Sequence, residues 1–158
     1  MEQPAKDLSK MTQITLPDQV LGSVQQFKNY DPSRIQHFEL TNGAVHLYMN
    51  EVDRLQAMLE YKSTIEAFRY EVDRRVRPET QSYKSFDYTD NFVLFTFIVS
   101  AELFADDVTA MMIERSLVED AMRYQLYSKK RIGVRVVYQD AYSGEVIRER
   151  VYPKDIEL

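Results

Sequence analysis

Hydrophobic and polar residues alternate with a period of two in three stretches of the chain, and each stretch contains two segments joined by turn residues. The first stretch surrounds Asn42-Gly43, which favours a tight hairpin because a type I′ turn requires positive φ at both central residues. With this turn, residues whose numbers sum to 85 oppose each other. The other pairs are residues 80–88 with 92–100 and residues 132–139 with 145–152. The pattern therefore predicts three β-hairpins.

Two segments between the hairpins repeat with a helical period instead. Residues 51–77 contain no Gly or Pro and are predicted to form one long helix, whose basic C-terminal turns suit the helix dipole. Its apolar residues follow a narrow repeat, closer to a coiled-coil seam than to a broad core face. Residues 107–128 are predicted to form a second helix with a broader stripe. The seam of the first helix consists of Met58, Tyr61, Ile65, Phe68 and Val72.

The rest of the pattern predicts where the domain begins and how its elements are ordered. Residues 1–15 are polar, and we expect them to form a flexible leader. A short helix with an apolar stripe can follow, although Gly22 disfavours it. Residues 16–158 are predicted to form a single α+β domain in the order hairpin, helix, hairpin, helix, hairpin. This order favours a mainly antiparallel sheet with both helices on one face. Because residues 92–100 are apolar on both sides, that strand is expected to be central in the sheet or buried on both faces. The stripe of the short helix comprises Val20, Leu21, Val24 and Phe27.

Composition narrows the class of protein. The chain has 158 residues, 44% of them hydrophobic, which fits a globular domain. It contains no cysteine, which excludes disulfides, thiolate metal sites and cysteine nucleophiles. The longest apolar run, residues 92–104, is interrupted by polar residues and is shorter than the roughly 20 residues of a membrane helix. Without an apolar N-terminal run there is no sign of a secretory signal, so we expect a cytoplasmic protein with no membrane partner.

Motifs for cofactors or catalysis are absent from the sequence. The four glycines are isolated, so there is no phosphate-binding loop, and no Gly-x-Ser-x-Gly elbow occurs. In the first hairpin, His37 is predicted to face Tyr48, and His46 to face Glu39. Two histidines and a carboxylate can hold a metal ion, but this polar side is more simply the solvated side of a hairpin. We therefore expect no cofactor and no enzyme activity.

Carboxylates also gather around the strand of residues 92–100. Such a set can act in acid–base catalysis or bind a divalent cation. However, turns and helix starts favour aspartate for structural reasons, and Asp90 is expected in a turn and Asp106 and Asp107 at a helix start. The set consists of Asp87, Asp90, Asp106 and Asp107.

The charges are unevenly distributed. The net charge is −5, which argues against general binding to nucleic acid. Residues 85–114 hold six Asp or Glu and no Lys or Arg, whereas the segments on either side are mildly basic. The basic residues are the candidates for contacts with nucleic acid, because arginine and lysine bind phosphates. They are Arg69, Arg74, Arg75, Arg77, Lys84, Lys129, Lys130 and Arg131.

Eleven tyrosines and eight phenylalanines occur without any tryptophan. Tyrosine, arginine and methionine are enriched at protein interfaces. Together with the narrow seam, this predicts a non-catalytic, adaptor or chaperone-like interaction module. We expect a homo-oligomer formed through the long helix or a sheet edge. A nucleic-acid-binding accessory protein is the main alternative; an enzyme and a component of a larger assembly, including one of a phage or mobile element, are others.

Overall fold

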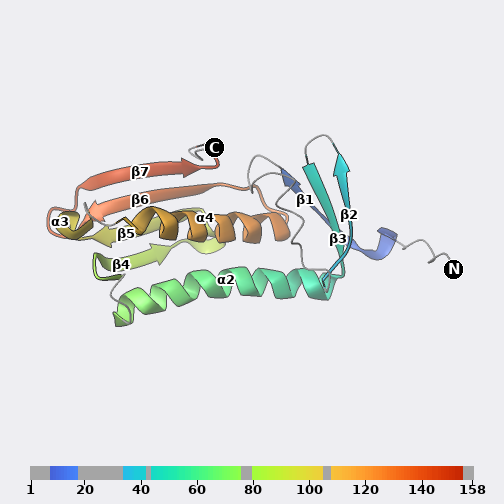
Figure 1. The fold of residues 1–158 in the computed structure, drawn as a ribbon, viewed down its shortest axis with the longest axis horizontal. Coiled ribbons are helices and arrows are strands. Elements are labelled where there is room, and N and C mark those ends of the chain that lie inside the picture. Colours follow the sequence, from blue (N-terminus) through green and yellow to red (C-terminus); the bar gives the residue numbers. More distant parts are fainter. Residues whose placement is uncertain (1–7, 18–33, 42–43, 76–79, 105–107, 155–158) are drawn as a thin grey trace. The chain divides into compact units, whose positions relative to one another are not determined.

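The computed structural model describes residues 8–17, 34–41, 44–75, 80–104 and 108–154. The chain divides into two compact units, Met1–Met58 and Leu59–Leu158, where the sequence predicted one domain over residues 16–158. Helices and antiparallel strands are both present, which confirms the α+β class (Figure 1). Within the described ranges, no helix has the length and apolar composition needed to span a membrane.

The first unit contains a three-stranded antiparallel sheet, sheet A. Its strands are β1 (Thr12–Pro17), β2 (Ile35–Thr41) and β3 (Ala44–Met49), in the order β1-β3-β2. A 3-10 helix, η1 (Leu8–Lys10), precedes them. The predicted hairpin is β2–β3, and its register is confirmed, because His37 pairs with Tyr48 and Glu39 with His46. The turn residues and the predicted short helix lie outside the described residues.

The sequence predicted a flexible leader over residues 1–15, but strand β1 begins within that segment, at Thr12. Ile14 is buried opposite Leu47, in the middle of β3. The segment is short and ends at Pro17, which is tolerated because β1 is an edge strand. Two apolar residues in alternation were too weak a signal to reveal it. Along β3, by contrast, Val45, Leu47 and Met49 are all buried and alternate with polar residues, as predicted.

Helix α2 (Glu51–Arg74) follows directly and contributes residues to both units. The amide of Arg54 donates to the carbonyl of Asn50 at its start, and Glu51 and Asp53 lie in its first turn. The helix ends earlier than the predicted residue 77, because Arg75 adopts a left-handed conformation with φ of 50°. Lys129 does the same, with φ of 60°, just after the last helix of the chain. Both helices thus end at a cationic residue near the negative end of the dipole.

The second unit contains a separate four-stranded sheet, sheet B. Its strands are β4 (Tyr83–Tyr88), β5 (Leu94–Val99), β6 (Val134–Asp140) and β7 (Val146–Tyr152), in that order. The hairpins β4–β5 and β6–β7 are antiparallel, as predicted. Strands β5 and β6 pair in parallel, which was not predicted. Parallel neighbours need a crossover connection, and α3 (Ala101–Phe104) and α4 (Ala110–Tyr127) supply it.

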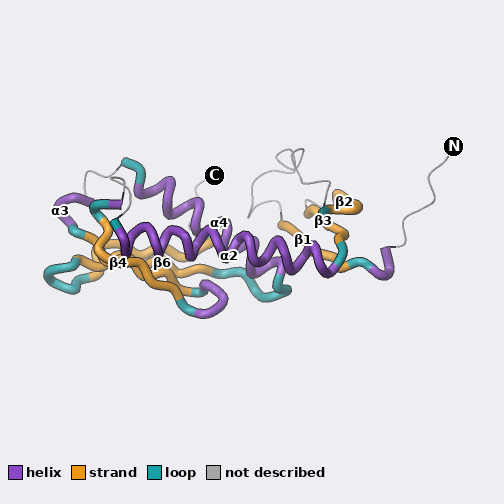
Figure 2. The backbone as a smooth tube through the Cα atoms, turned by 90° about the horizontal axis from the view of Figure 1, so that it is seen from below, coloured by secondary structure: helices purple, strands orange, loops and turns teal. Residues whose placement is uncertain are grey.

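The two faces of sheet B differ in burial. On β5, Phe95, Phe97 and Val99 are fully buried, whereas the alternating residues are half-buried. Strand β5 is central, as predicted, but the described helices of the second unit cover only one face (Figure 2). Phe68 of α2 contacts Phe86 and Phe97 on that face, with ring centroids 5.3 and 6.4 Å apart. Aromatic packing against α2 and α4 therefore forms the core of this unit.

A buried glutamine joins three segments at one end of sheet B. The side-chain amide of Gln125 in α4 donates to the carbonyl oxygens of Asn91, at 2.8 Å, and Gly133, at 3.0 Å. Its oxygen accepts from the amide of Gly133 at 2.9 Å. Asn91 belongs to η4 (Asp90–Phe92), the short helix between β4 and β5. Gln125 thereby connects α4, this turn and the entry to β6.

Candidate interaction surfaces

The predicted seam of α2 faces the interior of the protein instead of a second copy. Ile65, Phe68 and Val72 are buried, and Phe68 lies edge-on to Tyr83 with ring centroids 5.5 Å apart. Tyr61 lies edge-on to Tyr127 of α4 at 5.3 Å. The seam is narrow because it fits a ridge of aromatic rings on sheet B, which corrects the expectation of a coiled-coil contact. The fifth seam residue, Met58, is half-buried and accepts a 3.4 Å contact from the guanidinium of Arg54.

The basic residues form two separate groups. The basic residues of α2 come before β4 in the sequence, and β4 begins at the end of the sheet where Tyr83 pairs with Val99. Those that follow α4 precede β6, which begins at the opposite end of the sheet, where Arg135 pairs with Leu94 (Figure 1). No continuous basic stripe therefore forms from the described members of the two groups. Exposed members are Arg69, Arg74, Arg75, Lys84, Lys129, Lys130 and Arg131, while Arg77 lies outside the described residues.

Two of these arginines are engaged within the protein. The guanidinium of Arg69 lies 3.0 Å from the carboxylate of Asp87 and 5.3 Å from the ring centre of Tyr88. Arg74 lies 5.3 Å from the ring centre of Tyr70. Contacts of this kind fit salt bridges and ring stacking on the surface better than a phosphate-binding site.

The polar side of sheet A brings both histidines together with Glu39, but as separate pairs. Glu39 lies 3.2 Å from Nε2 of His37, its neighbour on the same strand. Nδ1 of His46 lies 3.0 Å from Thr15 Oγ1 and 3.2 Å from Gln13 Nε2, both in β1. The described part of the chain contains no group of three metal-ligating side chains. Glu39 does oppose His46 in the register, as predicted, but the imidazole of His46 contacts β1, a third strand that the sequence did not reveal.

The predicted carboxylate set is also dispersed. Asp87 is paired with Arg69, and Asp90 lies in the first turn of η4. Asp106 and Asp107 lie outside the described residues. Asp90 thus lies between the two strands, as predicted, whereas the pairing of Asp87 with Arg69 was not foreseen.

A buried polar cluster that the sequence did not reveal lies between α4 and β7. Glu114 has an exposed fraction of 0%. Its two carboxylate oxygens lie 3.0 and 3.2 Å from Nη1 of Arg150, and it accepts a hydrogen bond from the hydroxyl of Tyr152. Burial raises the pKa of Tyr152, and the hydrogen bond to the carboxylate raises it further. The position of Glu114 on the same helical stripe as Leu117 and Val118 is the signal that could have indicated it.

Tyr138 of β6 completes this cluster. Its ring stacks on Phe97 with centroids 4.7 Å apart, and its hydroxyl is buried without a hydrogen-bond partner among the described residues. Burial raises the pKa of Tyr138, and the nearby charge of Glu114 adds to the effect. Because the carboxylate is enclosed and its partners come from the chain itself, the cluster stabilises the core and is not open to a substrate.

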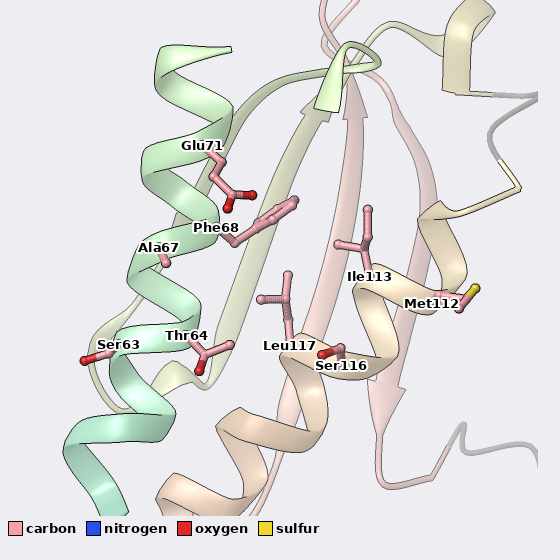
Figure 3. A pocket seen from close by; sticks show the side chains of 9 residues that line it. All are labelled: Ser63, Thr64, Ala67, Phe68, Glu71, Met112, Ile113, Ser116 and Leu117. Atoms are coloured by element: carbon pink, nitrogen blue, oxygen red, sulfur yellow. The ribbon is translucent and has the colours of Figure 1, made fainter. Parts of the chain in front are cut away.

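An open groove of about 590 Å³ lies between α2 and α4, within the size range of ligand pockets (Figure 3). Phe68 and Leu117 project between the two helices. Glu71 is the single ionisable residue of its lining. The full lining consists of Ser63, Thr64, Ala67, Phe68, Glu71, Met112, Ile113, Ser116 and Leu117.

A patch of exposed apolar residues continues from this groove around the start of α4. Met112 belongs both to the groove and to the patch. We call this the corner patch; it consists of Leu103, Val108, Met111 and Met112.

The face of sheet B opposite the helices is a second surface with apolar residues, here called the open face. The register places Leu94, Arg135 and Val151 in one row across three strands. In the next row Val137 lies beside Glu149, whose carboxylate is 2.6 Å from Nε of Arg135. That hydrogen bond lowers the pKa of Glu149. The apolar members of the open face are Ile147 and Val151, which are exposed, Leu94 and Ile98, which are half-buried, and Val137, which is buried between its neighbours.

These surfaces have to be interpreted from the chain's own residues. No protein-family model matches the chain, and no curated protein or solved structure shows significant similarity to it.

Proposed function

We propose that this protein is a non-catalytic protein-interaction module that self-associates by packing the open face of sheet B against the same face of a second copy. The observation that carries the proposal is that the two long helices, α2 and α4, cover one face of sheet B and leave apolar residues on the other. Ile147 and Val151 have exposed fractions of 42% and 43%. Two sheets pack face to face at about 10 Å when their facing residues interdigitate.

Charge supports a contact through the face. Arg135 and Glu149 are already paired within each copy, so covering this pair leaves neither charge unmatched.

The sheet edge expected from the sequence is a less suitable contact for self-association. If two β7 edges paired with their helices on the same side, Arg148 and Arg150 of both copies would lie close together, and like charges across strands are destabilising.

The size of the face predicts a weak dimer. Strands of six or seven residues spaced about 4.8 Å apart give a face of roughly 20 by 20 Å, about 400 Å² in plan. A standard interface buries about 800 Å² from each partner. We therefore expect association in the micromolar range, visible as a dependence of mass on concentration.

Sedimentation equilibrium from low micromolar to several hundred micromolar protein tests this. The wild type is expected to pass from monomer to dimer, and the double variant Ile147→Lys/Val151→Lys to stay monomeric with an unchanged circular dichroism spectrum. Val52→Lys, an exposed apolar position in the first unit, is the matched control and should still dimerise. A wild type that stays monomeric throughout, or a double variant that dimerises equally well, would overturn the proposal.

The proposal retains the cytoplasmic location expected from the sequence. The nucleic-acid alternative is less well supported, because Arg69 is paired with Asp87 and stacks over Tyr88, and the strands that follow the two basic groups begin at opposite ends of sheet B.

A further inference from the structure

We infer that the groove between α2 and α4, together with the corner patch, binds a basic amphipathic helix of a partner protein. This goes beyond the proposed function, because it concerns a different surface and a different partner from the second copy. Three properties of the surface support it: its shape, its exposed methionines and its surrounding charge.

The shape of the groove suits a helix. Amphipathic helices bind with their apolar face in a hydrophobic groove, often between two helices. Here Phe68 and Leu117 lie between α2 and α4, where apolar anchors of the partner would enter (Figure 3). Ala67 on one wall and Ser116 on the other are small and exposed, so a third helix can approach closely.

The corner patch extends the groove with large apolar side chains in water. Val108 and Met112 have exposed fractions of 87% and 73%. Four exposed apolar residues fall within residues 103–112, and exposed apolar clusters of this kind mark interaction sites in soluble proteins. Methionine is flexible and polarizable, so Met111 and Met112 can adapt to the side chains of a partner.

Charge determines the kind of helix. The sequence around the corner patch, residues 101–113, holds three acidic residues, Glu102, Asp106 and Asp107, and no basic one. Glu71 adds a carboxylate inside the groove, and Glu102 is exposed beside Leu103. Complementary potentials across an interface steer association and select partners, so the apolar face of the partner should be flanked by lysine or arginine.

Three nearby cations are engaged within the chain, and the guanidinium of Arg150 also lies 2.9 Å from Sδ of Met111. Arg148 lies over the ring of Phe104 at 5.2 Å, and Arg150 is bound to Glu114. Arg115 lies 3.8 Å from Glu119 on its own helix.

The test uses three fluorescent synthetic peptides as probes. One is an amphipathic helix of leucine and lysine, the second is a scrambled peptide of the same composition, and the third is the leucine–glutamate counterpart. Fluorescence anisotropy should show the leucine–lysine helix binding at least tenfold more tightly than either of the others. Equal binding of the scrambled peptide would show attraction by charge alone, and equal binding of the acidic helix would show that charge plays no part; either result overturns the inference.

Substitutions then locate the site. Ala67→Trp fills the groove from α2, and the expected result is a loss of affinity of at least tenfold. Ser116→Trp fills it from the opposite wall and serves if the first variant fails to fold. Gln56→Trp, an exposed position earlier in α2, is the matched control and should bind like wild type. Unchanged affinity in both groove variants would place binding elsewhere.

The same measurements on Ile147→Lys/Val151→Lys separate the two proposals. That variant alters only the open face, so it should bind the leucine–lysine helix normally whether or not the wild type self-associates.

Discussion

Strand β7 places two neighbouring residues, Glu149 and Arg150, in two different kinds of ion pair. Glu149 faces the open side and pairs with Arg135 at 2.6 Å, with both side chains largely in water. Arg150 points to the helix side and binds Glu114, which is completely buried. The strand alternation alone assigns them to opposite faces. The comparison shows that the number of ion pairs says little about stability until the surroundings of each are known.

Water explains the difference between the two pairs. An exposed pair gains little, because each charge is also well solvated when the pair is broken. In the buried pair, removing one partner leaves the other without water or counter-charge, so its loss is much larger than the net stabilisation by the intact pair. Arg150 is partly exposed, but Glu114 also accepts from the buried hydroxyl of Tyr152, so the loss of Glu114 removes the acceptor of two side chains at once.

The largest expected effect is that of Glu114→Ala. Leaving Arg150 and Tyr152 without their acceptor should lower the free energy of unfolding by about 3 kcal/mol. Urea unfolding followed by far-ultraviolet circular dichroism measures this, since the chain has no tryptophan. Glu114→Gln, which keeps the shape and one acceptor oxygen, should lose less. A loss below about 1 kcal/mol for the alanine variant would mean that the buried pair behaves like a surface pair.

An intermediate effect is expected at alkaline pH. The pKa values of Tyr138 and Tyr152 in the folded protein lie above their ordinary value of 10.0, so folding favours the protonated phenols. Their contribution to stability is complete below pH 10 and is lost as pH rises through the folded pKa values. The urea midpoint should therefore fall above about pH 10.

Tyrosine variants isolate this effect from the titration of lysines. Tyr152→Phe should show a shallower decrease in the urea midpoint above pH 10 than wild type. Tyr142→Phe is the matched control, because Tyr142 is exposed in the β6–β7 turn and should leave the pH dependence unchanged. Identical slopes in all three proteins would contradict the role given to the buried phenol.

The smallest effect is expected for Glu149→Ala. At low protein concentration the urea midpoint of this variant should match that of wild type within error. Added salt should shift the midpoint of both proteins by the same amount, because the pair is solvated and screened. A loss as large as that of Glu114→Ala would show that the open face is covered even in the monomer.

The parts of the fold that depend on neighbouring residues in the chain could be predicted from the sequence. Asn42-Gly43 and the alternation around it were sufficient to predict the register of β2 with β3, down to the pairing of His37 with Tyr48. The hairpins of sheet B followed from the same rule. Periodicity gives no information on which distant strands pair, so neither the parallel β5–β6 contact nor the addition of β1 to sheet A was foreseen.

The surfaces show the same limit. The seam residues were identified correctly as one apolar stripe, but whether a stripe meets another molecule or the chain's own sheet depends on tertiary packing; Ile65 and Phe68 are buried in the core. The groove requires two helices that are distant in sequence to lie side by side, so no local pattern indicates it. The Glu114 cluster likewise combines α4 with β7, and Glu114 and Arg150 are 36 residues apart in the chain.

Gln125 has a consequence for how this protein can vary. Because one side chain satisfies backbone groups of both the β4–β5 turn and the entry to β6, the lengths of these two loops are coupled. An insertion in either loop would move its carbonyl oxygen away from Gln125. The buried side-chain amide of Gln125 would then lack one of its hydrogen-bond partners. In the β6–β7 turn the residues are exposed, and so is the 2.9 Å hydrogen bond from the Ser143 amide to Asp140, so water can replace a hydrogen bond lost there. Natural or engineered insertions should therefore be tolerated at residues 141–145 and rejected at residues 89–93 and 129–133.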